Sequence, residues 1–150
     1  MEKINLNKCS WKSILDIGDV ERAIKGKTYP AKSILIPLSA MISTPMEILE
    51  NSGEVETKYA VLVVAEDHNP KYIFTSMERD WNRFITKYAT TINLQFDALK
   101  NFIIPVHDKP TQDYIAYRIN LIDTALEKEK KLIERTTIVK KHLLNDMFVS

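Results

Sequence analysis

Glycine and cysteine are scarce in this chain of 150 residues, and each scarcity excludes a class of function. Three glycines, Gly18, Gly26 and Gly53, cannot form a glycine-rich loop that holds a phosphate group or a dinucleotide. The single cysteine, Cys9, excludes a disulfide framework within the chain and is typical of a cytoplasmic protein. No apolar run is long enough to span a bilayer, and the first ten residues are polar and charged. We therefore expect neither a membrane partner nor a secretory signal.

The sequence also lacks a recognisable catalytic or metal-binding arrangement. The three histidines, His68, His107 and His142, are isolated from one another and from Cys9, at no spacing typical of metal ligands. We expect each of them to have a solvated surface role. The carboxylates are scattered over expected helix surfaces, and no pair is suited to acid–base chemistry. We predict that this chain is not an enzyme and has no metal and no cofactor.

Charge of one sign is not in excess. The net charge is +1, with 14 basic and 14 acidic residues in positions 1–110 and 7 and 6 in the remainder. Proteins that bind nucleic acid through non-specific electrostatics alone usually have a clearer basic excess. This balance indicates that any tight binding to DNA is shared with a partner.

The most informative segment present is the last third of the chain. From Thr111 onward it contains no glycine or proline, and apolar residues recur at alternating steps of three and four. Such spacing keeps one apolar stripe along an α-helix, and a helix of this length extends roughly 55 Å. Because that exceeds the width of a small domain, we expect much of the stripe to pack on a second copy of the chain. The expected dimer-interface residues are Ile115, Ile119, Ile122, Leu126, Ile133, Leu143 and Met147.

Two polar residues, Glu129 and Thr136, fall on the same series of positions. One interpretation is that the stripe drifts around the helix axis, so that Leu132 and Val139 replace them on the neighbouring row. The other is that they form a polar break that sets the register and orientation of paired helices. Both interpretations stay open at the level of sequence.

Two helices are predicted before this tail. Residues 1–10 form a loose arm, and helical spacing of apolar residues predicts a helix over Trp11–Ile24, which Gly26 would end. A second helix is predicted over Lys71–Tyr88, with Pro70 in its first turn. We expect Trp11 to be a core residue rather than a base-stacking one, and Trp81 likewise. The buried stripe expected for the second helix comprises Ile73, Met77, Trp81, Phe84 or Ile85, and Tyr88.

Three strands are predicted from short β-branched and apolar runs, at Ser33–Leu38, Tyr59–Val64 and Phe102–Ile104. The shorter intervening segments are an irregular Met41–Gly53 with one helical turn after Pro45, a strand or loop at Thr90–Leu94, and a turn of helix at Phe96–Leu99. Together these elements predict a mixed α+β (α/β) domain over residues 11–110, followed by a long coiled-coil helix over residues 111–150.

A series of short segments over residues 15–148 carries a family signature through its order and spacing. These segments are Ile17-Gly18-Asp19-Val20, Ile24-Lys25-Gly26-Lys27, Tyr59-Ala60-Val61-Leu62, Pro70-Lys71-Tyr72-Ile73, Thr90-Thr91-Ile92-Asn93, the run from Leu99 to Pro105, Gln112-Asp113-Tyr114-Ile115-Ala116, Ile122-Asp123 and the run from Lys140 to Phe148. In this order they resemble one half of the specificity subunit of type I restriction-modification systems. The last segment, similar to the spacer helix of that family, gives the strongest match.

The resemblance implies a partner set and an assembly. In that family two target recognition domains on one chain are held apart by two antiparallel spacer helices. Each domain reads half of a split site in double-stranded DNA, and the helices carry the methyltransferase (modification) subunits; the specificity subunit itself is not catalytic. A chain with one domain and one helix would have to form a homodimer to rebuild this two-fold arrangement.

The residues expected to contact DNA fall into two groups. Phosphate contacts are expected from the basic residues Lys25, Lys27, Lys32, Lys58, Arg79, Arg83 and Lys87. Contacts to base edges are expected from residues in predicted loops, with asparagine and glutamine suited to adenine: Tyr29, Thr90, Thr91, Asn93 and Gln95.

Two hypotheses of function follow. The first is a homodimeric DNA specificity subunit that positions methyltransferase and restriction subunits on a split site. The alternative is a phage or mobile-element protein that mimics the specificity subunit and modulates restriction without reading DNA. The short stretch between Lys27 and Tyr59 and the balanced charge favour this alternative. A third possibility is an α/β domain that dimerises for unrelated reasons.

Overall fold

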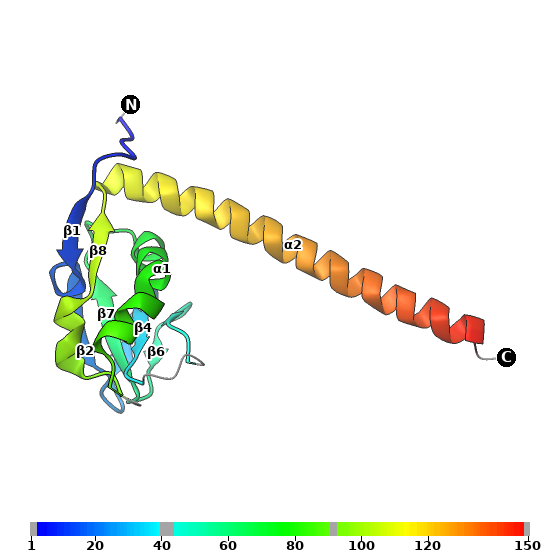
Figure 1. Cartoon of the computed structure of the whole chain (residues 1–150), viewed down its shortest axis with the longest axis horizontal. Helices are drawn as coiled ribbons and strands as arrows, with labels where there is room; N and C mark the ends of the chain where they lie inside the picture. The colour runs from blue at the N-terminus through cyan, green and yellow to red at the C-terminus, as the bar shows by residue number, and fades with distance from the viewer. Residues whose placement is uncertain (1–2, 40–43, 91–92, 149–150) are drawn as a thin grey trace. The chain divides into compact units, whose positions relative to one another are not determined.

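A computed structural model describes residues 3–39, 44–90 and 93–148 of the chain. Its contacts divide the chain into two units, one ending at Tyr114 and the other beginning at Ile115. The first unit contains all of the strands found among these described residues, and the second consists of most of the long C-terminal helix (Figure 1).

The centre of the first unit is a four-stranded antiparallel sheet in the order β2-β7-β4-β5. These strands span Gly18–Arg22 (β2), Tyr59–Val64 (β7), Ile34–Pro37 (β4) and Glu47–Ile48 (β5). The middle of β7 is fully buried at Ala60, Val61 and Leu62, as its continuous apolar sequence predicted. The predicted strand Tyr59–Val64 is confirmed, and β4 lies within the predicted Ser33–Leu38.

The other strands in the described part of the chain form two smaller antiparallel pairs. β1 (Ser10–Ser13) pairs with β8 (Ile103–Val106), and β3 (Thr28–Tyr29) pairs with β6 (Gly53–Glu54). The predicted strand Phe102–Ile104 is therefore confirmed with its bounds shifted toward Val106. It follows the short 3-10 helix η2 (Phe96–Asn101), which was predicted as a turn of helix over Phe96–Leu99.

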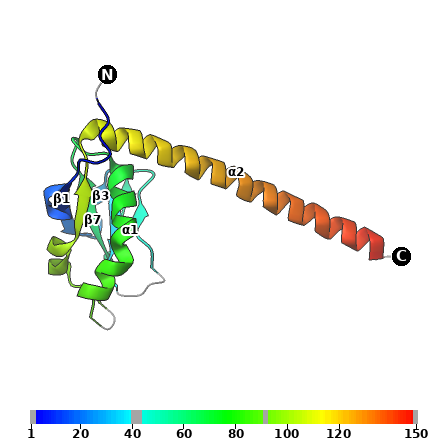
Figure 2. The same cartoon turned by 45° about the horizontal axis from the view of Figure 1, so that its top comes forward.

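The helix α1 (Pro70–Tyr88) lies beside the strands of this unit (Figures 1 and 2). It begins where the Asn69 side chain accepts a hydrogen bond from the Tyr72 amide at 3.2 Å, with Pro70 in its first turn. Its buried stripe comprises Tyr72, Ile73, Met77, Trp81, Phe84 and Ile85. The helix and the core position of Trp81 are therefore confirmed, and Phe84 packs on Phe102 with ring centroids 4.4 Å apart.

The predicted helix over Trp11–Ile24 is wrong. This segment forms β1, the 3-10 helix η1 (Ile14–Asp16) and β2, and the Ser13 side chain accepts a hydrogen bond from the Leu15 amide. Apolar residues three apart suit this strand–turn–strand path as well as a helix, and pairing with the distant β7 and β8 decides between them. Trp11 is correspondingly 62% exposed on β1, so its expected place in the core is also wrong.

The segment after β4 also differs from expectation. No helical turn follows Pro45 among the described residues, because Glu47–Ile48 pairs with β4 as an edge strand. Residues 40–43 lie outside the described residues. Within the segment Thr90–Leu94, Asn93 forms an isolated bridge with Ser39, while residues 91 and 92 are not described.

The C-terminal helix α2 (Lys109–Phe148) has 40 residues and is continuous along its length (Figure 1). It begins two residues before the predicted start, because the Asp108 carboxylate accepts a hydrogen bond from the Thr111 amide at 3.0 Å and Pro110 fits the first turn. All side chains from Asn120 to Phe148 are exposed. Among the described residues, no helix is both long enough and apolar enough to cross a membrane.

Candidate nucleic-acid interface

Three strands of the central sheet meet at one edge, and the loops that leave this edge are neighbours. β2 ends at Arg22 opposite Ala60, β4 ends at Pro37 opposite Tyr59, and β7 begins at Tyr59. The Ala23 amide donates to the Tyr59 carbonyl at 3.0 Å, and the Leu38 amide donates to the Lys58 carbonyl at 3.0 Å. We refer to this edge as the loop end of the first unit.

The segment after α1 is tied to the same edge. The Leu94 amide donates to the Leu38 carbonyl at 3.4 Å, beside the bridge between Ser39 and Asn93. The Thr90 hydroxyl and amide both donate to the Asn93 carbonyl at 3.0 Å. Asn93 is therefore held by its backbone, while its side chain is exposed.

These loops enclose a shallow cavity of about 380 Å³. Its lining combines two cationic groups, two amides and two hydroxyls with two leucines: Arg22, Leu38, Ser39, Thr57, Lys58, Asn93, Leu94 and Gln95. Cations and hydroxyls of this kind bind phosphate oxygens, and asparagine and glutamine can form paired hydrogen bonds with adenine. The loop end thus has the chemistry of a surface for polar contacts to nucleic acid.

The charge of Lys58 is stabilised by its surroundings. Its ammonium lies 3.1 Å from the Glu56 carboxylate and 5.2 Å from the centroid of the Tyr59 ring. The hydrogen bond from Lys58 to Glu56 raises the pKa of the lysine above its ordinary value, and the nearby Tyr59 adds to this. Lys58 is therefore protonated at neutral pH and remains exposed.

The loop end brings together part of the predicted DNA-contacting set. Lys58, Asn93 and Gln95 line the cavity, and Thr90 is bonded to Asn93. Thr91 lies outside the described residues. Lys25 and Lys27 lie in the turn between β2 and β3, where the Lys27 ammonium forms an ion pair with Glu21.

The remaining predicted basic residues lie elsewhere. Lys32, with a positive φ of 69°, precedes β4 at the end opposite Pro37, and its amide donates to the Leu49 carbonyl at 2.7 Å. On α1, Arg79 and Arg83 both contact the Asp80 carboxylate, at 3.0 and 3.1 Å. The Lys87 ammonium lies 5.2 Å from the centroid of the Tyr88 ring.

The expectation that Tyr29 reaches DNA from a loop is wrong. Tyr29 is 1% exposed, in β3. Its hydroxyl donates to the Glu21 carboxylate at 2.8 Å and accepts from the Ile24 amide at 3.1 Å. Burial, the first cause, and the hydrogen bond to Glu21 raise the pKa of Tyr29 above its ordinary value, although the hydrogen bond from Ile24 opposes them. The buried Tyr29 hydroxyl therefore stabilises the turn after β2 through these two hydrogen bonds.

A second cavity, of about 330 Å³, lies between α1 and the β1–β8 pair. Its lining includes the exposed Trp11, Arg83 and Lys87 and the buried Phe84 and Phe102. A core position, as expected for Trp11, would have prevented this side chain from stacking on bases. Its exposed position is compatible with such stacking.

Sequence reasoning missed three polar residues of the loop end, Arg22, Ser39 and Thr57. Arg22 was assigned to a helix that does not form, and a helix would not place it opposite Ala60. The pairing of β2 with β7 is long-range, so no local signal in the sequence could have found this position.

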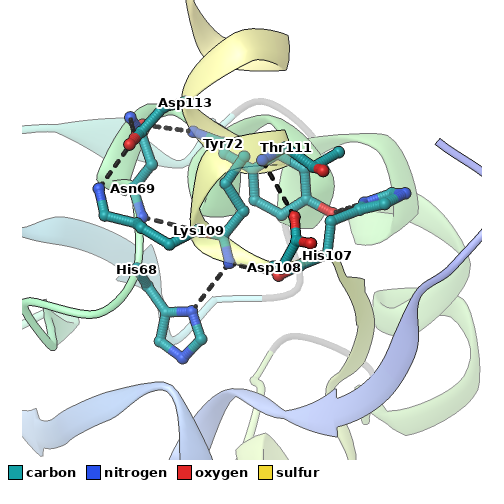
Figure 3. Close-up of polar contacts among 9 residues, drawn as sticks. His68, Asn69, Tyr72, His107, Asp108, Lys109, Thr111 and Asp113 are labelled. Atoms are coloured by element: carbon teal, nitrogen blue, oxygen red, sulfur yellow. Dashed lines mark hydrogen bonds and ion pairs between the residues drawn. The ribbon is translucent and has the colours of Figure 1, made fainter. Parts of the chain in front are cut away.

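The expected surface position is confirmed for one histidine and wrong for another. His142 is exposed as predicted, whereas His68 is 7% exposed and its Nδ1 lies 3.1 Å from the amide nitrogen of Gln112. The solvated role expected for His68 is therefore wrong. His107 is half-buried, with Nδ1 2.7 Å from the Tyr72 hydroxyl and Nε2 3.2 Å from the Leu6 carbonyl oxygen (Figure 3).

His68 and His107 belong to a polar network at the start of α2 (Figure 3). Asp113 accepts from the Asn69 side chain at 2.7 Å and from the Lys109 ammonium at 2.8 Å. These two hydrogen bonds, first the one from Lys109, lower the pKa of Asp113 below its ordinary value. The network joins the N-cap of α1 to the first turn of α2 within the first unit.

Comparison with solved structures places this fold among the specificity subunits of type I restriction-modification systems. The S subunit from M. genitalium matches with a TM-score of 0.70 at 15% identity, over 98% of this chain and 48% of that chain. A chain from a structural study of assembly and conformational transition of the type I R-M system matches with a TM-score of 0.72 at 12% identity. That match covers 90% of this chain and 43% of the other chain. No protein-family model and no curated protein matches the sequence.

The chain spans a little under half the length of each of these two structures. At 15% and 12% identity the likeness establishes the fold, a mixed α+β domain followed by a long helix. The predicted fold class and the resemblance to one half of a specificity subunit are confirmed.

Proposed function

We propose that this chain is a half-length DNA specificity subunit of a type I-like restriction-modification system. It dimerises through α2 and positions methyltransferase and restriction subunits on a split DNA site, which a symmetric dimer reads as a palindrome. The chain itself is not catalytic. The observation that carries this proposal is the match to the S subunit, which covers 98% of the chain, α2 included.

The loop end supports the DNA-reading part of the proposal. Arg22 and Lys58 supply phosphate contacts, and the exposed amides of Asn93 and Gln95 supply base contacts. Because the net charge is only +1, these contacts act together with those of the modification subunit.

The proposal is tested by measuring DNA binding of the chain co-expressed with the type I modification subunit of its host. Duplexes with a randomised centre are selected on the complex, and affinity for the enriched duplex is measured by fluorescence anisotropy over a range of salt concentrations. We expect an enriched split sequence and salt-sensitive binding. An Arg22→Ala/Lys58→Ala variant should lower the slope of log affinity against log salt by about two, since each lost phosphate contact contributes about 0.9.

The matched control is Lys32→Ala, which removes an exposed cation at the opposite end of β4. It should leave both the slope and the enriched sequence unchanged. A chain that neither binds the modification subunit nor enriches any duplex would refute the proposed function.

The alternative function, a mimic that modulates restriction without reading DNA, is favoured by the balanced charge. It predicts that the chain binds the modification subunit but enriches no sequence. Adding the chain to an intact restriction complex should then lower cleavage. Unchanged cleavage and subunit composition would count against this alternative.

A further inference from the structure

The cavity between α1 and the β1–β8 pair has no lining residue in common with the cavity at the loop end. Its volume of about 330 Å³ is at the small end of the range for ligand sites, so it has room for one small molecule. Its lining comes from β1, from the second half of α1 and from the stretch between the end of η2 and the start of β8. An exposed tryptophan, two cations and an amide meet there over buried aromatic rings.

Trp11 has an aromatic face that the protein leaves open. It lies in β1 opposite Pro105 of β8 and is 62% exposed. Buried rings of the same cavity pack on one another, with the centroids of Phe84 and Phe102 4.4 Å apart, whereas Trp11 makes no such ring contact among the described residues. Because pairing with β8 holds its backbone, this indole is a fixed surface on which a planar group can stack.

Cations lie on the α1 side of the cavity. Arg79, Arg83 and Lys87 are four residues apart and therefore lie on one side of the helix. The Asp80 carboxylate contacts Arg79 at 3.0 Å and Arg83 at 3.1 Å. A guanidinium has five N–H donors and Arg83 uses one nitrogen on Asp80, so donors remain for an anion. Three cations beside one carboxylate leave an excess of positive charge, which suits a phosphate group.

Asn101 adds a polar edge to the cavity. It is half-buried at the end of η2, and its side chain makes no hydrogen bond within the described part of the chain. The Ser13 hydroxyl donates to the carbonyl of the preceding residue, Lys100, at 2.8 Å, which ties this stretch to β1. An asparagine amide has one donor group and one acceptor, the arrangement that complements the edge of adenine.

We propose that this cavity binds a single nucleotide whose base is unpaired. The base stacks on Trp11 with its edge toward Asn101, and Arg83 and Lys87 hold the phosphate. The base must be unpaired because a base inside a duplex is already stacked and hydrogen-bonded to its complement. This site goes beyond the proposed function, in which the loop end reads paired bases, and it does not depend on that function.

A nucleotide suits this lining better than an aromatic side chain of a protein partner. A phenylalanine would stack on Trp11 but would leave the Asn101 amide without a hydrogen bond, because its ring edge has no donor or acceptor. A nucleotide combines a flat face, a polar edge and an anion. It is therefore the ligand class that uses the indole, the amide and the cations together.

Titration of the full chain with adenosine monophosphate (AMP) and with adenosine tests the site. Stacking of AMP should quench the fluorescence of Trp11, and Trp11→Phe should remove most of this quenching because the remaining Trp81 is buried. In equilibrium dialysis AMP should bind more tightly than adenosine, since only AMP has a phosphate. Absence of AMP binding, or equal affinity for AMP and adenosine, would overturn the proposal.

Two variants separate the contact to the base from the contact to the phosphate. Trp11→Ala should weaken the binding of AMP and of adenosine alike by at least about fivefold, since it removes one base-stacking contact. Arg83→Gln/Lys87→Gln should weaken AMP but leave adenosine within about twofold of wild type, so that the two ligands bind equally. These side chains are exposed, and circular dichroism checks that each variant is folded.

Lys32→Gln is the matched control, because it removes an exposed cation that does not line this cavity. It should leave the affinities for AMP and adenosine unchanged. A Trp11→Ala chain that binds AMP as tightly as the wild type would overturn the proposed stacking site.

Single-stranded DNA distinguishes the two sources of such a nucleotide. If a short strand of deoxyadenosines binds much more tightly than AMP, the site takes a nucleotide of a single strand; equal affinity assigns it to a free nucleotide, and either result supports the proposal. A duplex of the same sequence should not quench Trp11, and quenching equal to that of the single strand would overturn the need for an unpaired base.

An acidic peptide that contains phenylalanine tests the competing ligand. Quenching of Trp11 by this peptide, without quenching by AMP, would assign the cavity to a protein segment and overturn the proposal. The proposed function is tested separately by the Arg22→Ala/Lys58→Ala variant at the loop end, so the failure of one leaves the other standing.

Discussion

The side-chain nitrogen of Gln112 lies 3.1 Å from Nδ1 of His68, and both residues are buried. The same nitrogen donates to the His107 carbonyl at 2.7 Å, and the Gln112 side-chain oxygen accepts from the Asn69 amide at 2.9 Å. One amide thus satisfies three polar groups from the turn before α1 and the segment before α2. Because Gln112 donates to Nδ1, the neutral His68 ring carries its proton on Nε2, 3.8 Å from Asp67.

Replacing Gln112 with alanine should destabilise the first unit. The substitution removes this partner from the His68 ring nitrogen in a buried setting, and from the His107 carbonyl and the Asn69 amide in a partly buried one. Since an unsatisfied buried polar group costs about 1–3 kcal/mol, we expect a loss of at least about 2 kcal/mol in the free energy of unfolding. Urea unfolding followed by tryptophan fluorescence, in a Trp11→Phe background that leaves the buried Trp81 as the sole tryptophan, measures this loss.

The matched control is Gln95→Ala, which removes the same side chain from an exposed position at the loop end. It should change the free energy of unfolding by no more than about 0.5 kcal/mol. Equal losses in the two variants would show that the buried amide has no special role.

Gly18 should not tolerate a side chain. It pairs with Val64 at the start of β2, and an added Cβ would lie 2.1 Å from the Val63 carbonyl oxygen. Because this neighbour is backbone in a central strand, β2 would have to move, and we expect Gly18→Ala to cost about 1–3 kcal/mol or more. Gly53→Ala is the control, since nothing lies within 4 Å of its added Cβ, and it should change stability by about 0.5 kcal/mol at most. A thermal melt that is the same for both variants would contradict this account.

Asp108 predicts a loss of stability in acid. The hydrogen bonds from Thr111, first from its side chain and then from its amide, lower the pKa of Asp108 below its ordinary value of 3.8. A carboxyl whose pKa is lower in the folded state stabilises the protein above its unfolded pKa, and this contribution is lost as pH falls through the folded pKa. We therefore expect the free energy of unfolding to fall below about pH 4, and to fall less steeply in Asp108→Asn.

Asparagine retains the N-cap of α2, so this variant separates titration from capping. Urea unfolding of wild type and variant over a pH series tests the expectation, with Asp146→Asn as a control on the exposed surface of α2. Parallel pH profiles for wild type and Asp108→Asn would be the contrary result.

Elements whose signal is local were predictable from the sequence. The apolar run at Tyr59–Val64, the stripe of α1 and the uninterrupted tail each identify one element, because a few neighbouring residues fix its period. Residues 11–24 were not predictable in this way. Their spacing suits a helix, but hydrogen bonds to β7 and β8, about 45 and 90 residues away in the chain, make them strands.

The candidate site was predictable in part for the same reason. Asn93 and Gln95 follow α1 in a polar stretch, so their exposure could be expected from their neighbours. Arg22 joins them only through the pairing of β2 with β7, and His68 is buried only because Gln112 approaches from the start of α2. Both of these misses, at Arg22 and His68, concern a contact between segments far apart in the chain.

Tyr29 separates a structural role from a role in DNA binding. Its hydroxyl is buried between the Glu21 carboxylate and the Ile24 amide, so Tyr29→Phe removes one acceptor and one donor. We expect the free energy of unfolding to fall by about 1–3 kcal/mol, because the Ile24 amide loses its partner in a partly buried setting. Affinity for the enriched duplex should stay within about twofold of wild type, since Tyr29 does not reach the surface.

Lys58→Ala should give the opposite pattern, a near-unchanged unfolding curve with weaker, less salt-sensitive binding. If Tyr29→Phe instead lowered DNA affinity while its unfolding curve stayed that of wild type, the buried position of this side chain would be wrong, and the turn after β2 would have to present Tyr29 to the DNA.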